Sequence, residues 1–224
     1  MTIGILGGGV WGSALAKLFS DQEVLIYTRD KKVMNSINDH HFNPKLKYAT
    51  FNDNVKATDD LESITKKSLI FIALPTQNIR EVLSNSYFQN LNADVIIASK
   101  GIEISSSLFL SQLVENLIKP KSLSILSGPC FSDEVAQDLP TAATFASSNS
   151  SIFDIISGML KTKKFRIYYS DDVIGCQIGG ALKNIYAIAA GISDGLNLGE
   201  NARSALITRS FVEISRFAIF FNSK

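Results

Sequence analysis

The sequence is poor in the features that mark several large protein classes. It has two cysteines in 224 residues, Cys130 and Cys176, which are too few and too far apart for a disulfide scaffold or a metal site. Lys and Arg total 22 against 21 Asp and Glu, and the net charge of +1 argues against nucleic acid or an anionic membrane as a partner. The sequence therefore predicts two reduced thiols, no metal, and no nucleic-acid or membrane partner.

Targeting signals and repeats are also lacking. The first residues have neither the basic region nor the apolar region of a secretory signal, and no apolar run approaches the roughly 18 residues of a membrane span. These absences favour a cytoplasmic location. The chain is 46% hydrophobic and 19% charged, a composition typical of a globular protein with a substantial core.

What the sequence does contain is a glycine fingerprint at its start. An apolar run at 3–6 leads into Gly7, Gly9 and Gly12 in G-x-G-x-x-G register, and a small-residue helix pattern follows over 10–19. In such fingerprints the glycines permit a tight turn, a close approach to a pyrophosphate, and close packing of helix on strand, in that order. We predict a dinucleotide site here, with the helix N-terminus facing the phosphates. The alternative is a glycine-rich turn with no ligand.

The second strand, expected over 23–27, bears on the choice of dinucleotide. A carboxylate at the end of this strand normally receives the ribose hydroxyls of NAD. Here Asp30 comes one or two residues late and Arg29 precedes it. A guanidinium can pair with a 2′-phosphate or stack on adenine, so the pattern favours tolerance of NADP beside NAD. The alternative for Arg29 is a solvated loop charge.

Strands and helices alternate along the first 170 residues. Further strands are expected over 55–58, 69–74, 95–98, 123–126, 141–146 and 165–169. Continuous apolar strands fit a parallel sheet that is covered on both faces. The sequence predicts an α/β fold with a Rossmann-type, doubly wound, mostly parallel sheet over residues 1–170, followed by a helical domain over 171–224.

Two lysines stand where ligand chemistry is expected. Lys100 follows the apolar strand at 95–98, and ligands bind at the carboxyl ends of such strands. Lys183 lies in a predicted helix, and Gly179 and Gly175 lie on the same face, one and two turns earlier respectively. Without side chains, these two glycines leave a shallow surface, which we call the glycine floor. We interpret Lys183 as facing a ligand that lies over it. The alternative is small-residue helix packing with the lysine turned outward.

Five motifs, in order, resemble those of bacterial NAD(P)-dependent glycerol-3-phosphate dehydrogenase. They are Gly-Gly-Gly-Val-Trp-Gly at 7–12, Ala-Ser-Lys-Gly-Ile-Glu at 98–103, Leu-Ser-Gly-Pro at 126–129, Leu-Pro-Thr-Ala at 139–142, and the run 171–209 with Gly-Gly-Ala-Leu-Lys-Asn. The resemblance spans nearly the whole chain to Arg216. It implies an oxidoreductase that interconverts sn-glycerol 3-phosphate and dihydroxyacetone phosphate with NAD or NADP, in the service of phospholipid synthesis.

The resemblance also implies roles for particular residues. Lys183 matches the general base, and Lys100 matches a residue that contacts both cofactor and substrate. Gly128 and Cys130 match substrate positions, although a thiol donates a weaker hydrogen bond than the family's usual serine or threonine. The cofactor positions that match are Gly7, Gly9, Val10, Trp11, Gly12, Arg29, Lys100 and Ser132. A lysine acts as a base near neutral pH only where burial or a nearby cation disfavours its charged form, and Lys100 is the expected cation.

The family continues beyond the end of this sequence. Its further residues include a GDL–TCT–SRN motif that supplies an aspartate near the base and an arginine–asparagine pair for the substrate phosphate. We therefore interpret the chain as C-terminally truncated or frame-shifted, with an incomplete all-helical domain over 171–224. Such a chain is expected to expose apolar surface on its helix pair and to bind the substrate phosphate more weakly.

Two alternatives to an active dehydrogenase stay open. One is an inactive dinucleotide-binding remnant. The other is a related β-hydroxyacid-type dehydrogenase that shares the glycine-rich helix with its lysine and asparagine. On the main interpretation the partner is a phosphorylated triose or glycerol, and the oligomeric state is open, with a homodimer among the options.

Overall fold

The computed structural model describes residues 1–161 and 163–224. Over these residues eight strands form one sheet in the order β3-β2-β1-β4-β5-β6-β7-β8. The strands are β1 (Thr2–Leu6), β2 (Glu23–Tyr27), β3 (Val55–Thr58), β4 (Leu69–Ile72), β5 (Asp94–Ile97), β6 (Ser122–Ser127), β7 (Thr141–Ser147) and β8 (Phe165–Ser170). All neighbouring pairs are parallel except β6 and β7, which are antiparallel. The mostly parallel, doubly wound sheet predicted from the sequence is confirmed.

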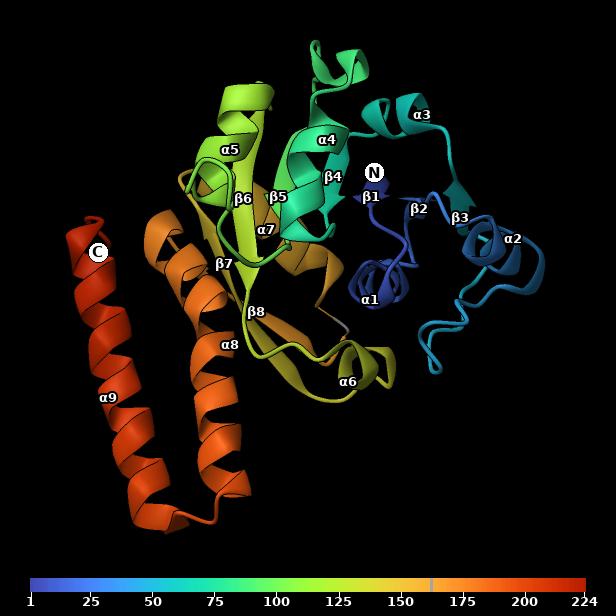
Figure 1. Ribbon diagram of the computed structural model, residues 1–224. Helices are drawn as coiled ribbons and strands as arrows, with labels where there is room; N and C mark the ends of the chain where they lie inside the picture. The colour runs from blue at the N-terminus through green and yellow to red at the C-terminus, as the bar shows by residue number, and fades with distance from the viewer. Residues whose placement is uncertain (162) are drawn as a thin grey trace.

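Helices cover both faces of this sheet (Figure 1). On one face lie α1 (Val10–Leu18), α2 (Lys31–His40), α6 (Ser132–Ala136) and α7 (Ser150–Met159). On the other lie α3 (Leu61–Thr65), α4 (Ile79–Leu83) and α5 (Leu110–Leu117), with the short 3-10 turns η1 (Thr76–Asn78) and η2 (Ser86–Phe88) on the way. Alternate strand residues serve the two layers: Ile5 and Phe71 pack under α1, whereas Leu6 and Ile72 pack on the opposite face.

Aspartate residues precede the first turn of several helices. The Asp30 carboxylate accepts hydrogen bonds from the first-turn amides of α2, Asp60 does the same for α3, and Asp172 accepts from the Gly175 amide at the start of α8. Each cap satisfies amides that have no partner within the helix. The caps therefore fix where the chain turns from a strand end into the next helix.

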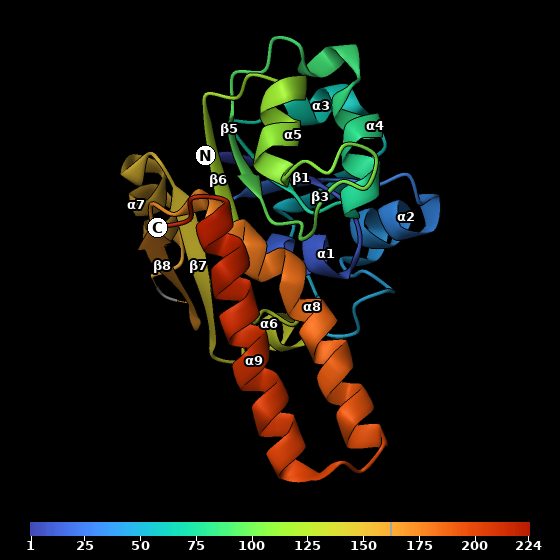
Figure 2. The ribbon, with the colours of Figure 1, turned by 60° about the vertical axis from the view of Figure 1, so that its left-hand side comes forward.

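The last two helices, α8 (Val173–Gly195) and α9 (Gly199–Phe220), form a hairpin that projects from the sheet (Figure 2). The first half of α8 lies against β6, because Gly180 has no side chain: a Cβ there would lie 2.7 Å from Ser127 Oγ. Farther out the pair exposes apolar side chains, as the sequence leads one to expect; Phe211 and Phe220 are 72% and 79% exposed.

One of the described helices has the length and composition of a membrane span, which the sequence analysis did not expect. This helix is α8, whose most apolar 18-residue window has a mean hydropathy of 1.2. Core helices of globular proteins meet the same criterion. Although α8 packs on β6 and α9, only 17% of this window is buried, so most of its apolar surface is exposed.

At two positions of the turn between β1 and α1, a side chain would collide with backbone atoms. Gly7 has φ +123°, a conformation that side chains other than glycine rarely adopt, and a Cβ there would lie 2.6 Å from the Ala73 carbonyl oxygen. A Cβ on Gly12 would lie 1.9 Å from the Gly7 carbonyl oxygen. A Cβ on Gly9, in contrast, would have no atom within 4 Å. The fold thus requires Gly7 and Gly12, whereas Gly9 leaves open space.

We predict that Gly12→Ala and Gly9→Ala separate these two roles. Gly12→Ala forces backbone apart and should lower the free energy of unfolding by about 3 kcal/mol or more. Gly9→Ala should stay within about 1 kcal/mol of the parent, because only the helix cap is changed. Urea unfolding monitored by circular dichroism measures both. Equal stability losses would contradict the steric assignment.

Candidate functional site

A cavity of about 600 Å³ opens at the carboxyl ends of the central strands. It lies where the strand order reverses, between β1 and β4, and its walls come from the ends of β1, β2, β4 and β5. Three strand spacings of about 4.8 Å separate β2 from β5, so the cavity extends over about 14 Å. The position and volume are those of ligand sites in doubly wound sheets.

The lining of this cavity fits a dinucleotide. Gly9 caps α1 without a side-chain hydrogen bond, so first-turn amides of α1 are open to a ligand. A Cβ built on Gly9 would have no atom within 4 Å, so the space next to this residue is open. Apolar walls come from Ala73, Leu74 and Val82, and lysine or arginine stands at each end. An anionic pyrophosphate suits the amides and helix dipole, and flat rings suit the apolar walls.

Two lysines from distant segments meet beside this cavity. Lys100 follows β5, and its Nζ donates to the Gly128 carbonyl oxygen at 3.0 Å. Lys183, in the third turn of α8, donates to the same oxygen at 3.1 Å. Gly175 and Gly179 line a second cavity of about 360 Å³ together with Lys183 and Gly128. The glycine floor expected next to Lys183 is therefore present in the geometry.

The surroundings of Lys100 disfavour its charged form. Burial, and then the neighbouring Lys183 ammonium, lower the pKa of Lys100 from 10.5 to about 8. Burial also raises the pKa of the Cys130 thiol. Lys100 can therefore lose a proton at mildly alkaline pH, whereas Cys130 is held as a neutral thiol. Its Sγ lies 3.7 Å from the Ala142 carbonyl oxygen, a weak hydrogen bond.

The loop that carries Lys100 is tied down by the segment after β4. Thr76 Oγ1 donates to the Lys100 carbonyl oxygen at 2.8 Å. Arg80 makes a two-point ion pair with Glu103, through Nε at 2.8 Å and Nη2 at 2.6 Å. Glu103 is only 2% exposed. The motif that carries the family resemblance thus includes a buried carboxylate whose partner lies 23 residues away, which no sequence pattern revealed.

The other sequence-predicted cofactor residues fall into two groups. Those that line the 600 Å³ cavity are Gly7, Gly9, Val10, Trp11, Arg29, Lys100 and Ser132, together with the substrate candidate Cys130. Gly12 lies behind the turn and acts through packing. Trp11 also donates from Nε1 to the Ala98 carbonyl oxygen at 3.1 Å, which fixes its ring at the end of β5. Arg29 is paired with Glu81 at 2.9 Å.

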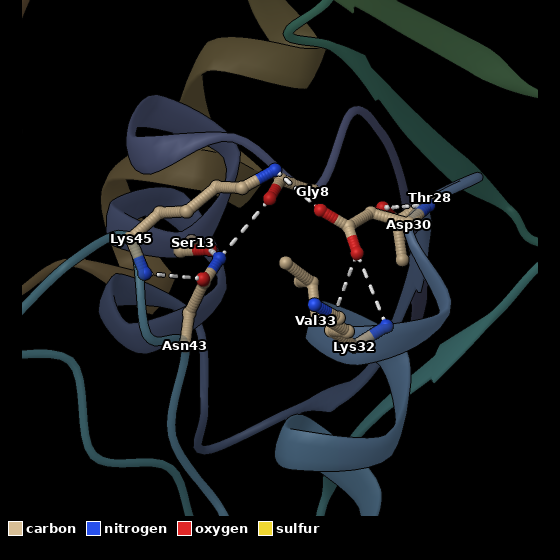
Figure 3. A network of polar contacts seen from close by, with 8 residues as sticks. All are labelled: Gly8, Ser13, Thr28, Asp30, Lys32, Val33, Asn43 and Lys45. Atoms are coloured by element: carbon tan, nitrogen blue, oxygen red, sulfur yellow. Dashed lines mark hydrogen bonds and ion pairs between the residues drawn. The ribbon is translucent and has the colours of Figure 1, made fainter.

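A polar network that no sequence motif marks lies at the β2 end of the cavity (Figure 3). Asn43 is fully buried, and its side-chain amide donates to the Gly8 carbonyl oxygen and to Ser13 Oγ. Lys45, two residues on, lines the cavity and pairs with Asp30. Both lie in the loop 41–54, which has no motif. Within residues 1–161 and 163–224, no group of three or more metal-binding side chains gathers, and both cysteines are free.

Comparison with protein families matches both parts of the chain. Residues 2–153 match the family described as NAD-dependent glycerol-3-phosphate dehydrogenase N-terminus, and residues 172–224 match its C-terminus counterpart. Among curated relatives, the glycerol-3-phosphate dehydrogenase (NAD(P)+) of Zymomonas mobilis is 40% identical over 99% of this chain, and that of Bacillus licheniformis is 41% identical over 96%. The chain spans 65% and 64% of the lengths of these two relatives.

Solved structures agree with this match. The crystal structure of glycerol-3-phosphate dehydrogenase from Coxiella burnetii superposes with a TM-score of 0.91 at 34% identity, covering 100% of this chain and 70% of that one. The enzyme of Plasmodium falciparum gives a TM-score of 0.92 at 28% identity, covering 100% and 68%. The arrangement of sheet and helix pair is thus shared with these proteins.

The Arg80–Glu103 pair yields a prediction about acid stability. Arg80, and then Ser106, lower the pKa of Glu103 from 4.5 to about 2. Between these values the unfolded chain binds more protons, so the stability that Glu103 contributes is complete above pH 4.5 and is lost as the pH falls toward 2. Glu103→Gln should lower stability at neutral pH and flatten its decline over this window.

Urea unfolding at a series of pH values measures this effect. Glu115→Gln is the matched control, because Glu115 is exposed on α5. If Glu103→Gln shows the same acid limb as the parent and the control, the ion pair does not stabilise the loop.

Proposed function

Because the chain belongs to the NAD-dependent glycerol-3-phosphate dehydrogenase family, we propose that it binds NAD(H) or NADP(H) and interconverts sn-glycerol 3-phosphate and dihydroxyacetone phosphate. The family match over residues 2–153 and 172–224 supports this proposal. The observation that carries the chemistry is the meeting of Lys100 and Lys183 at the Gly128 carbonyl oxygen, next to the dinucleotide cavity.

The cofactor is held by backbone and apolar walls in this proposal. The amides that begin α1 receive the pyrophosphate, and the space above Gly9 admits it. Lys100 and Trp11 bound the far end of the cavity at the carboxyl end of β5. The nicotinamide supplies or accepts a hydride when it is bound. The surrounding side chains determine which carbon can approach it.

Proton transfer falls to the lysines. Oxidation of a secondary alcohol needs a base that takes the hydroxyl proton, and reduction of the ketone needs an acid that returns it. We assign this role to Lys183, which faces the glycine-lined cavity, and we assign to Lys100 the contact with both cofactor and substrate. Since burial and the Lys183 ammonium lower the pKa of Lys100 to about 8, Lys100 can give up a proton at mildly alkaline pH.

Gly128 and Cys130 complete the substrate side of the proposal. The Gly128 carbonyl oxygen orients both ammonium groups, so it sets where a substrate oxygen meets them. Cys130 lies at the edge of the dinucleotide cavity and offers a thiol. A compact phosphorylated triose or glycerol suits a cavity of about 360 Å³ with a cationic wall. We propose a cytoplasmic setting, where such metabolites and free thiols occur together.

Lys183→Ala tests the proposed role of the base. Loss of general acid–base catalysis should lower the rate of NADH oxidation with dihydroxyacetone phosphate by about a hundredfold to ten-thousandfold. The dissociation constant for NADH, measured by fluorescence titration, should stay nearly unchanged, because Lys183 lines the second cavity and not the first. The exposed Lys119→Ala serves as the control.

Two outcomes would count against the proposal. A Lys183→Ala protein with the parental rate would remove the base assignment. A parent chain that binds NADH but shows no turnover with dihydroxyacetone phosphate would replace the dehydrogenase by a dinucleotide-binding protein.

A further inference from the structure

The β2 end of the dinucleotide cavity carries a carboxylate that is already engaged. Asp30 Oδ1 accepts hydrogen bonds from the backbone amides of Lys32 at 3.0 Å and Val33 at 3.3 Å, which cap α2. Its Oδ2 accepts from Lys45 Nζ at 2.7 Å. Asp30 therefore has both oxygens occupied before any ribose arrives, and its charge is balanced by a lysine from another segment.

Lys45 is delivered to this position by the loop 41–54. Asn43 is fully buried and donates to the Gly8 carbonyl oxygen at 3.0 Å and to Ser13 Oγ at 2.6 Å. Asn43 Oδ1 accepts from the Lys45 backbone amide at 2.9 Å. The backbone of Lys45 is thus tied to the glycine turn, and its side chain extends toward Asp30 (Figure 3). The side chain is 50% exposed and lines the cavity.

A second cation at this end is held loosely. Arg29 lines the cavity and pairs with Glu81 at 2.9 Å, with side chains 59% and 65% exposed. Exposed ion pairs contribute little to stability, so an anionic ligand group can recruit Arg29 at small cost. Whether this end of the cavity has a net positive charge then depends on whether the negative charge of Asp30 is neutralised.

We propose that Lys45 is a specificity-determining residue: by neutralising Asp30 it allows the cavity to accept a dinucleotide with a 2′-phosphate. This inference rests on the proposed function, because it concerns the cofactor of the same site. An unbalanced carboxylate at this place would repel a 2′-phosphate and favour free ribose hydroxyls. With Lys45 present the carboxylate is balanced, and the Arg29 guanidinium can pair with the phosphate without an opposing charge beside it.

The probes 2′,5′-ADP and 5′-AMP isolate the effect, because only 2′,5′-ADP carries a 2′-phosphate. Calorimetric titration of the full chain should show that the parent binds 2′,5′-ADP at least as tightly as 5′-AMP. Lys45→Met should weaken binding of 2′,5′-ADP by about tenfold or more and change binding of 5′-AMP by less than about twofold. Lys45→Arg, which keeps the charge, should retain the parental ratio.

A second substitution tests the mechanism. Asp30→Asn keeps the helix cap and removes the charge, so the double variant Lys45→Met/Asp30→Asn should recover 2′,5′-ADP binding to within about threefold of the parent. Lys47→Met is the control, since Lys47 is on the same loop and lies over the Tyr48 ring instead. Melting temperatures without ligand report whether each variant folds.

The possible outcomes are distinguishable. Equal loss of both probes in Lys45→Met, no loss of either, or no recovery in the double variant would overturn the role of Lys45. A parent chain that binds neither NADH nor NADPH would instead overturn the proposed function. The parental ratio in Lys45→Arg and Lys47→Met, combined with a selective loss in Lys45→Met, supports the inference.

Discussion

Two ammonium groups share one carbonyl oxygen, that of Gly128, and the rest of the site depends on keeping them there. Like charges in a partly buried place repel, so the arrangement persists only because the fold fixes both backbones. Lys183 arrives on α8, which approaches β6 closely because residue 180 is glycine. Lys100 arrives on a loop tied to Thr76 and, through Glu103, to α4. Burial, and then the enforced proximity of Lys183, lower the pKa of Lys100 to about 8.

The dinucleotide cavity and the lysine pair adjoin because parallel strands present all their carboxyl ends on one edge of the sheet. The two ends of the cavity are nevertheless built differently. The turn at Gly7 is a local device that a few consecutive residues specify. The β2 end depends on Asn43, whose hydrogen bonds reach back 30 and 35 residues to Ser13 and Gly8. If Lys45 has the role proposed for it, cofactor choice depends on a loop outside the fingerprint.

Much of the fold could be predicted from the sequence, since apolar runs and caps are local signals. The bounds of β2 and β3 agree with those expected, and the aspartates Asp60 and Asp172 cap the helices that follow them. Long-range pairing could not be predicted: neither the antiparallel β6–β7 contact nor the partner of Glu103 leaves a trace in spacing. For Gly175, the sequence predicted a place in the glycine floor next to Lys183. It did not predict a second role: a Cβ on Gly175 would collide with the Asp172 carboxylate that caps α8. The roles of Lys100 and Lys183 stay predictions that the geometry supports.

The most direct measurement is the titration of Lys100 itself, by NMR of the chain labelled with ¹³C at the lysine ε carbons, with Lys100→Arg to assign the signal. The account predicts that Lys100 titrates near pH 8, and that its pKa rises part of the way toward 10.5 in Lys183→Met, where the second ammonium group is removed and the burial of Lys100 remains. A Lys100 signal that titrates near 10.5 in the parent chain, or one that Lys183→Met leaves unmoved, would contradict the convergence on which the site is built.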